Sequence, residues 1–106
     1  GKHHGTAIAT GGRSDVTAVC TLGDIGGAQD STFELEASDD GSAWTTLATA
    51  PTRYAAAQDI LRATTTRKYV RVSQSIVGDQ CGASAAIILL RGGEQLPESN
   101  SNVTAA

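Results

Sequence analysis

The sequence predicts an all-β protein: a small antiparallel β-sandwich or jelly roll of about seven to eight short strands. Three observations lead to this prediction. Short segments with apolar side chains at alternate positions recur along the chain. Turn segments rich in Gly and Asp separate them at intervals of about 8 to 12 residues. The length of 106 residues suits one domain and is too short for two.

The first two predicted strands precede a long loop. Thr6–Thr10 alternates and stops at the glycine pair 11–12. Asp15–Leu22 is rich in β-branched and apolar residues, which predicts a strand with one buried face. The side chains expected on that face are Val16, Ala18, Cys20 and Leu22, with Thr17, Val19 and Thr21 on the other. Gly23–Asp30 follows as a loop of residues that tolerate positive φ.

A β-hairpin is predicted next. In the strand Ser31–Ser38, the side chains of Phe33, Leu35 and Ala37 are expected inward, with Glu34 and Glu36 outward on a solvated face. An Asp-Gly turn over residues 39–42 leads into the return strand Trp44–Ala48, and Asp-Gly between two such segments is a strong hairpin signal. We therefore assign Asp39 and Asp40 to backbone hydrogen bonding in the turn rather than to acid/base chemistry.

The second half of the chain contains three more predicted strands. Residues 52–66 are ambiguous, and we interpret them as a loop that enters a short strand at Asp59–Ala63. Lys68–Val77 is a strand with two valines inward and Arg71 outward. These inward residues are Val70 and Val72. After a turn at Gly78–Gly82, Ala83–Arg91 is the most apolar strand, predicted to be central and covered on both faces.

The predicted domain organisation has three parts. Residues 1–12 form an N-terminal arm with the first short strand, residues 13–93 form the β-sandwich domain, and residues 94–106 form a polar C-terminal tail, disordered or draped over a neighbour. No signal peptide or spanning segment is visible. The longest apolar run, Ala85–Leu90, is far shorter than the ~20 residues that a bilayer requires.

Charge, cysteines and histidines exclude several classes of function. The net charge of −3 argues against a nucleic-acid partner, which needs a basic patch. Cys20 and Cys81 are expected to be buried thiols, although a disulfide between neighbouring strands remains open. His3 and His4 are adjacent and lack the spacing of metal ligands, so no metal or cofactor is predicted.

Enzyme signatures are also missing. No Gly-x-Ser-x-Gly segment occurs, and no Lys follows the glycines of the 23–27 segment as a phosphate-binding loop requires. The two histidines lie in a segment expected to be flexible, which cannot hold a general base in place. We therefore predict a protein that is not an enzyme, with no catalytic, cofactor-binding or metal-binding residue.

Trp44 is the one aromatic residue whose context suggests more than one role. The segment Asp39-x-Gly41-x-Ala43-Trp44 resembles an Asp-box hairpin, in which the Trp packs under the turn, but the leading Ser is replaced by Ala37. Core packing is the interpretation we favour. The alternative is a carbohydrate-binding module, as in discoidin-like sandwiches, and the scarcity of aromatic residues argues against it. Its stacking residues would be Trp44 with Tyr54 or Tyr69, and Asp39 or Asp40 would bond hydroxyls.

Taken in order, the predicted elements resemble a family of small proteins encoded in the head-gene regions of tailed bacteriophages. The matching segments are TAVCTLGDIGG, TFELEASDDGSAWTTL, RKYVRVSQSIVG, ASAAIILLRGG and the proline at position 97. The most specific parts are Ser38–Trp44 and Lys68–Val72. The alanine-rich stretch Tyr54–Gln58 and the two cysteines depart from the family pattern.

The resemblance implies a head decoration (cement) protein with a jelly-roll-like sandwich. Such a protein docks on the major capsid protein lattice as a dimer or trimer and stabilises the shell. Its place would be the outer capsid surface of the virion, after synthesis in the host bacterial cytoplasm. The surface we expect to bind combines Gly1–Gly12, Leu96–Ala106 and the loop Gly23–Asp30. Another virion β-domain, such as a tail or fibre component, is an alternative alongside the carbohydrate-binding module.

Overall fold

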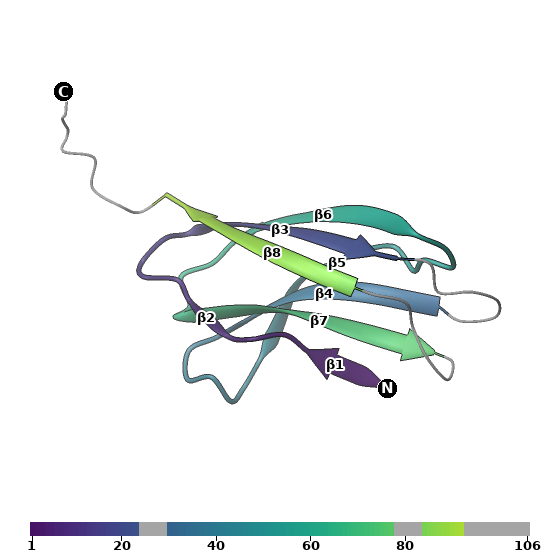
Figure 1. Ribbon diagram of the computed structural model, residues 1–106. Helices are drawn as coiled ribbons and strands as arrows, with labels where there is room; N and C mark the ends of the chain where they lie inside the picture. Colours follow the sequence, from purple (N-terminus) through teal and green to yellow (C-terminus); the bar gives the residue numbers. More distant parts are fainter. Residues whose placement is uncertain (24–29, 78–83, 93–106) are drawn as a thin grey trace, which may run out of the picture.

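The computed structural model describes residues 1–23, 30–77 and 84–92, and these form eight strands and no helix (Figure 1). All strand pairings are antiparallel, and the strands make two sheets, so the predicted all-β sandwich is confirmed. None of the described residues forms a helix long and apolar enough to cross a membrane. The strands are β1 (Lys2–His4), β2 (Ile8–Ala9), β3 (Asp15–Leu22), β4 (Asp30–Ser38), β5 (Thr45–Thr49), β6 (Ala57–Thr64), β7 (Tyr69–Val77) and β8 (Ser84–Arg91).

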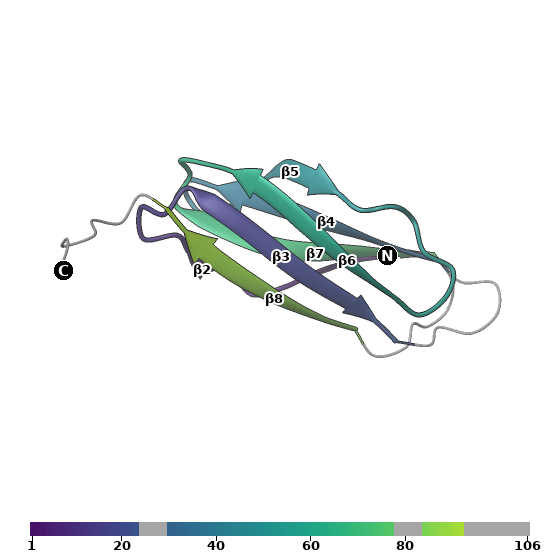
Figure 2. The ribbon, with the colours of Figure 1, turned by 90° about the horizontal axis from the view of Figure 1, so that it is seen from above.

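The two sheets stack as layers, as Figure 2 shows from above. The larger sheet has the order β1-β7-β4-β5, and β2 pairs with the same edge of β7 as β1 does. The smaller sheet has the order β6-β3-β8. Because β3, β4 and β7 each have neighbours on both sides, these three strands form the centres of the two layers and carry most of the core.

The core between the layers consists of the side chains that alternation places inward. Every residue predicted inward on β3, β4 and β7 is buried. These residues are Val16, Ala18, Cys20, Leu22, Phe33, Leu35, Ala37, Val70 and Val72. Cys20 is a free, buried thiol, and burial followed by the nearby charge of Asp59 raises its pKa to about 11. Cys81 lies outside the described residues.

The predicted hairpin is confirmed as β4 and β5. Ala37 pairs with Thr45, and the register shifts by one residue between Leu35 and Glu36. The ambiguous region 52–66 contains β6, which starts earlier than the predicted Asp59–Ala63 because it pairs with β3 along its whole length.

The N-terminal segment runs along the outer edge of the larger sheet. Both β1 and β2 pair with β7, and the Gly5 N–H between them donates to the Val72 carbonyl at 2.8 Å. A side chain at position 5 would place its Cβ 2.8 Å from that carbonyl oxygen, so the close approach requires glycine. His3 and His4, which we expected in a flexible segment, are instead part of β1.

The position of β8 differs from the prediction. The apolar strand was expected at the centre of a sheet with both faces covered, but β8 is an edge strand whose only described neighbour is β3. Ile88 and Leu90 pack partly against the core, whereas Ile87 and Leu89 point outward and are 61% and 52% exposed. The centre of the smaller sheet is taken by β3, which leaves one face and one edge of β8 open.

Three predicted features fall on residues that the structure does not describe. They are most of the loop Gly23–Asp30, the turn Gly78–Gly82 and the C-terminal tail 94–106.

Candidate functional site

The outer face of the larger sheet contains a polar cluster around Glu36. The sequence placed this side chain on a solvated face, and that expectation is wrong, because Glu36 is only 4% exposed. Its side chain does point outward, but Lys2 from β1 and Arg71 from β7 lie against it. We call this group the Glu36 cluster; its members are Lys2, His4, Glu34, Glu36, Trp44, Arg71 and Ser73.

The carboxylate of Glu36 is bound on both oxygens. Arg71 Nε donates to Oε1 at 2.8 Å, and Ser73 Oγ donates to the same oxygen at 2.6 Å. Lys2 Nζ donates to Oε2 at 2.9 Å and lies equally close, 2.9 Å, to Oε1 of Glu34. Three donors from two different strands therefore hold one nearly buried charge on the face of β4.

These donors set the charge state of the cluster. Burial by itself would raise the pKa of Glu36, but the hydrogen bonds from Ser73, Lys2 and Arg71 outweigh it and lower the pKa from 4.5 to about 2. The hydrogen bonds that Lys2 donates to Glu34 and Glu36 raise the pKa of Lys2 in turn. Glu36 and Lys2 are therefore both charged throughout the neutral range.

A histidine extends the cluster to the sheet edge. His4 Nδ1 lies 2.9 Å from Ser73 Oγ. The single hydroxyl proton of Ser73 is donated to Glu36, so His4 Nδ1 must carry the proton of the second hydrogen bond. Ser73 is fully buried, so its hydroxyl joins two side chains and is not available as a nucleophile.

Trp44 lies on this outer face and not in the core, which corrects the predicted core packing. The ring is half-buried, and the guanidinium carbon of Arg71 sits 4.0 Å from its centroid. Stacking of a guanidinium on an indole is a favourable cation–π contact. Arg71 therefore connects Trp44 to Glu36, and one ring face of Trp44 is covered by the protein itself.

Of the two turn acids, Asp40 makes the backbone hydrogen bonds that the sequence predicted, whereas Asp39 forms an ion pair instead. Asp40 Oδ1 accepts the backbone N–H groups of Ser42 and Ala43 at 2.8 and 3.0 Å and the Ser38 hydroxyl at 3.0 Å. These bonds, with those from Ala43 and Ser42 strongest, lower the pKa of Asp40 to about 2. Asp39 instead forms an ion pair with Arg67 at 2.8 Å. The Ser and Asp that organise the turn are therefore Ser38 and Asp40, and not the pair Ala37 and Asp39 on which the Asp-box comparison was based.

The aromatic residues proposed for sugar stacking do not all converge. Trp44 precedes Thr45, which pairs with Ala37 near the end of β4, whereas Tyr54 follows Arg53, which bridges to Ser31 near its start. Six residues of strand separate these points, or about 20 Å. Tyr54, 68% exposed, therefore cannot share a platform with Trp44. Tyr69 pairs with Ser38 and lies at the same end of β4 as Trp44.

The outer face of the smaller sheet has a different chemistry. Ile60, Val19 and Ile87 form one row across its three strands, and Arg62, Thr17 and Leu89 form the next. Ile60 is 54% exposed. Neither Arg62 nor Arg91 forms an ion pair with a described residue. We call this surface the exposed sheet face; its large or charged members are Asp15, which lies opposite Arg91 on the neighbouring strand, and Val19, Ile60, Arg62, Ile87, Leu89 and Arg91.

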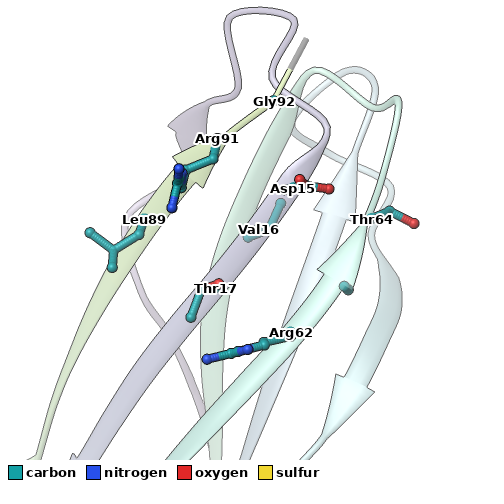
Figure 3. Close-up of a pocket in the computed structure, with 9 residues that line it drawn as sticks. Asp15, Val16, Thr17, Arg62, Thr64, Leu89, Arg91 and Gly92 are labelled. Atoms are coloured by element: carbon teal, nitrogen blue, oxygen red, sulfur yellow. The ribbon is translucent and has the colours of Figure 1, made fainter.

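A hollow of ≈ 870 Å³ lies at one end of this face (Figure 3). Arg62 on β6 extends toward Thr17 of β3, and Arg91 is on β8 at the other side of β3. Exposed arginines beside an apolar side chain such as Leu89 can contact a carboxylate on a partner surface. No nearly buried polar group lines the hollow, so its chemistry is that of a contact surface.

The sequence missed these two faces for different reasons. Glu36 and Arg71 are opposite charges at outward positions of two strands. Their ion pair could be predicted only if the register between β4 and β7 were already known. The exposed sheet face was not predicted, because β8 was expected to lie at the centre of a sheet with both of its faces covered. Within the described parts of the chain, no three His, Cys, Asp or Glu side chains come together as metal ligands do. No protein-family model, curated protein or solved structure matches this chain.

Proposed function

We propose that this chain is a structural protein of a tailed bacteriophage that binds the outer surface of the capsid and stabilises it. The observation that carries the proposal is the exposed sheet face. There, a row of large apolar side chains lies beside two arginines that have no ion-pair partner among the described residues. A surface of this composition suits a protein partner, because burial of apolar area provides affinity and charge complementarity provides orientation.

The nature of the partner comes from the sequence. The segments Ser38–Trp44 and Lys68–Val72 resemble those of phage head proteins, and the capsid lattice is the partner that this resemblance implies. A small domain on a repeating lattice gains stability by mass action and strengthens the subunits that it bridges.

The proposed docking surface differs from the one expected from the sequence. In the N-terminal segment, Lys2–His4 and Ile8–Ala9 are already paired with β7, and His4 and Lys2 are bound within the Glu36 cluster. The charged side chains of the Glu36 cluster therefore pair with one another on that face. On the exposed sheet face, Arg62 and Arg91 form no such pair with a described residue, and we place the capsid contact there.

The test is to mix the purified protein with undecorated mature phage heads and image them by cryo-electron microscopy. We expect regular extra density at fixed lattice positions. Ile60→Lys, on the exposed sheet face, should weaken that density, whereas Thr49→Lys, at an exposed position of the larger sheet, should leave it unchanged. Bare heads at saturating protein would contradict the proposal. Density on the tails or fibres of whole virions would instead support the alternative that the protein is a tail or fibre component.

A further inference from the structure

We infer that two copies of this chain associate through β8, which pairs with β8 of the second copy in antiparallel orientation about a two-fold axis at Ile87. This inference goes beyond the proposed function and holds whether or not the protein binds a phage head. It rests on the open edge of the smaller sheet, on the sequence of β8 and on a groove beside that strand.

The edge of β8 is available for pairing. Alternate residues of an antiparallel edge strand direct their N–H and C=O groups away from the sheet, and no described strand lies on that side of β8. In Figure 2, β8 is the outermost strand of its layer. The strand runs for eight residues in unbroken register with β3, without proline or bulge, and its one charged side chain, Arg91, is at its last residue.

The sequence of β8 is complementary to itself in this register. With Ile87 opposite Ile87 of the second copy, the three other large apolar side chains of the strand each face a small one. On the outer face Leu89 lies opposite Ala85, and on the inner face Ile88 lies opposite Ala86. Leu90 lies opposite Ser84 in the same way. A two-fold axis perpendicular to the sheet keeps outer faces outer and inner faces inner, so both copies make the same contacts.

The inner face offers space for these side chains. A groove of ≈ 220 Å³ lies between β1 and the small residues that begin β8, and Phe33, Val72 and Gln74 also line it. Ile88 and Leu90 are only partly buried within one copy. In the paired arrangement, those two side chains of the second copy lie opposite Ala86 and Ser84, at the mouth of this groove.

The outer face becomes continuous across the pair. Ile60, Val19 and Ile87 already form one row in a single copy. Pairing at Ile87 extends the row through the axis, so that six large apolar side chains cross a six-stranded sheet. Because residue 87 of one copy lies opposite residue 87 of the other, a substitution there places two copies of the new side chain against each other. This makes the arrangement testable.

The experiment is sedimentation equilibrium of the full chain over micromolar to millimolar concentrations. We expect the wild type to reach twice the monomer mass of 10.8 kDa. Ile87→Lys should raise the dissociation constant by about 100-fold, since it removes apolar burial on both copies and opposes two like charges. Ile60→Lys is the matched control in the same row, and it should leave the dimer intact.

Mixing two variants with opposite charges at position 87 provides the decisive test of the two-fold axis. Ile87→Lys and Ile87→Glu should each be monomeric and should form a heterodimer when mixed, because only at the axis do these two charges meet directly. Circular dichroism of each variant establishes that the β-sandwich is folded. A wild type that stays monomeric to millimolar concentration would overturn the inference. So would a dimer that Ile87→Lys leaves intact, or one that Ile60→Lys dissociates, since the last result would mean face-to-face packing.

Discussion

Glu36 and Arg71 lie opposite each other on the β4–β7 ladder, and Arg71 Nε donates to Glu36 Oε1 at 2.8 Å while its guanidinium covers Trp44. The pair joins the two central strands of the larger sheet to the hairpin loop and, through Lys2, to the N-terminal strand. A charge that is 4% exposed and bound by three donors is costly to disrupt. Removal of any one partner would therefore leave an uncompensated charge on this face of the sheet.

Glu36→Gln should destabilise the protein by about 3 kcal/mol, because it removes the charge that compensates Arg71 and Lys2. Urea unfolding followed by circular dichroism measures the change. Glu34→Gln is the matched control: Glu34 is more exposed and is bound by Lys2 alone among the described ion pairs, so its loss should cost about 1 kcal/mol or less. Equal effects of the two variants would show that the donors around Glu36 contribute little.

Acid should unfold or loosen the protein in a defined pH range. The pKa of Glu36 in the folded chain is about 2, below its ordinary value of 4.5, so its stabilisation is complete above about pH 5 and is lost as the pH falls toward 2. The loss should be on the order of 3 kcal/mol. Asp40, whose pKa is also lowered to about 2, changes in the same direction.

Unfolding free energies at pH 6 and pH 2.5 test this dependence. Trp44 is the single tryptophan and contacts Arg71, so its fluorescence follows the cluster directly. Glu36→Gln should show a clearly smaller loss between the two pH values than the wild type. The same loss in both proteins would assign the acid sensitivity to other carboxylates.

The hairpin loop is held by hydrogen bonds to the hydroxyl group of Ser38. Ser38 Oγ accepts the N–H groups of Asp40 and Gly41 at 3.2 and 2.9 Å and donates to Asp40 Oδ1. Ser38→Ala should therefore cost about 1 to 2 kcal/mol, since it removes the three hydrogen bonds that this buried hydroxyl makes. Ser42→Ala, in the same loop at an exposed position, should change stability by less than about 0.5 kcal/mol. Thermal unfolding of the two variants side by side would reveal a wrong assignment if they shift equally.

Local alternation was enough to predict which residues of β3, β4 and β7 face the core, because the period of two needs no knowledge of pairing. It failed for β8, since an apolar strand has the same pattern whether its second face is covered by its own chain or by another molecule. It also failed for the environment of Glu36. The donors Lys2, Arg71 and Ser73 are 34, 35 and 37 residues away in the sequence, and only the sheet register brings them together.

The smaller sheet contains a second buried carboxylate, and it provides the last prediction. Asp59 points inward from β6 and is held by Arg53, whose Nε donates to Oδ1 and Oδ2 at 3.2 and 3.1 Å. Arg53→Ala should destabilise the protein by about 2 to 3 kcal/mol, mostly through the uncompensated charge that remains at Asp59. Arg53→Ala combined with Asp59→Asn should then be more stable than Arg53→Ala alone.

A double-mutant cycle separates this explanation from simple loss of packing by the arginine side chain. Unfolding free energies of the wild type, Arg53→Ala, Asp59→Asn and the double variant should give a coupling of about 1 kcal/mol or more. The second substitution removes the charge that made the first one costly, so the effects cannot add. Additive effects would mean that Arg53 acts through its aliphatic stem, and that the carboxylate of Asp59 is accommodated on the inner face of β6 without it.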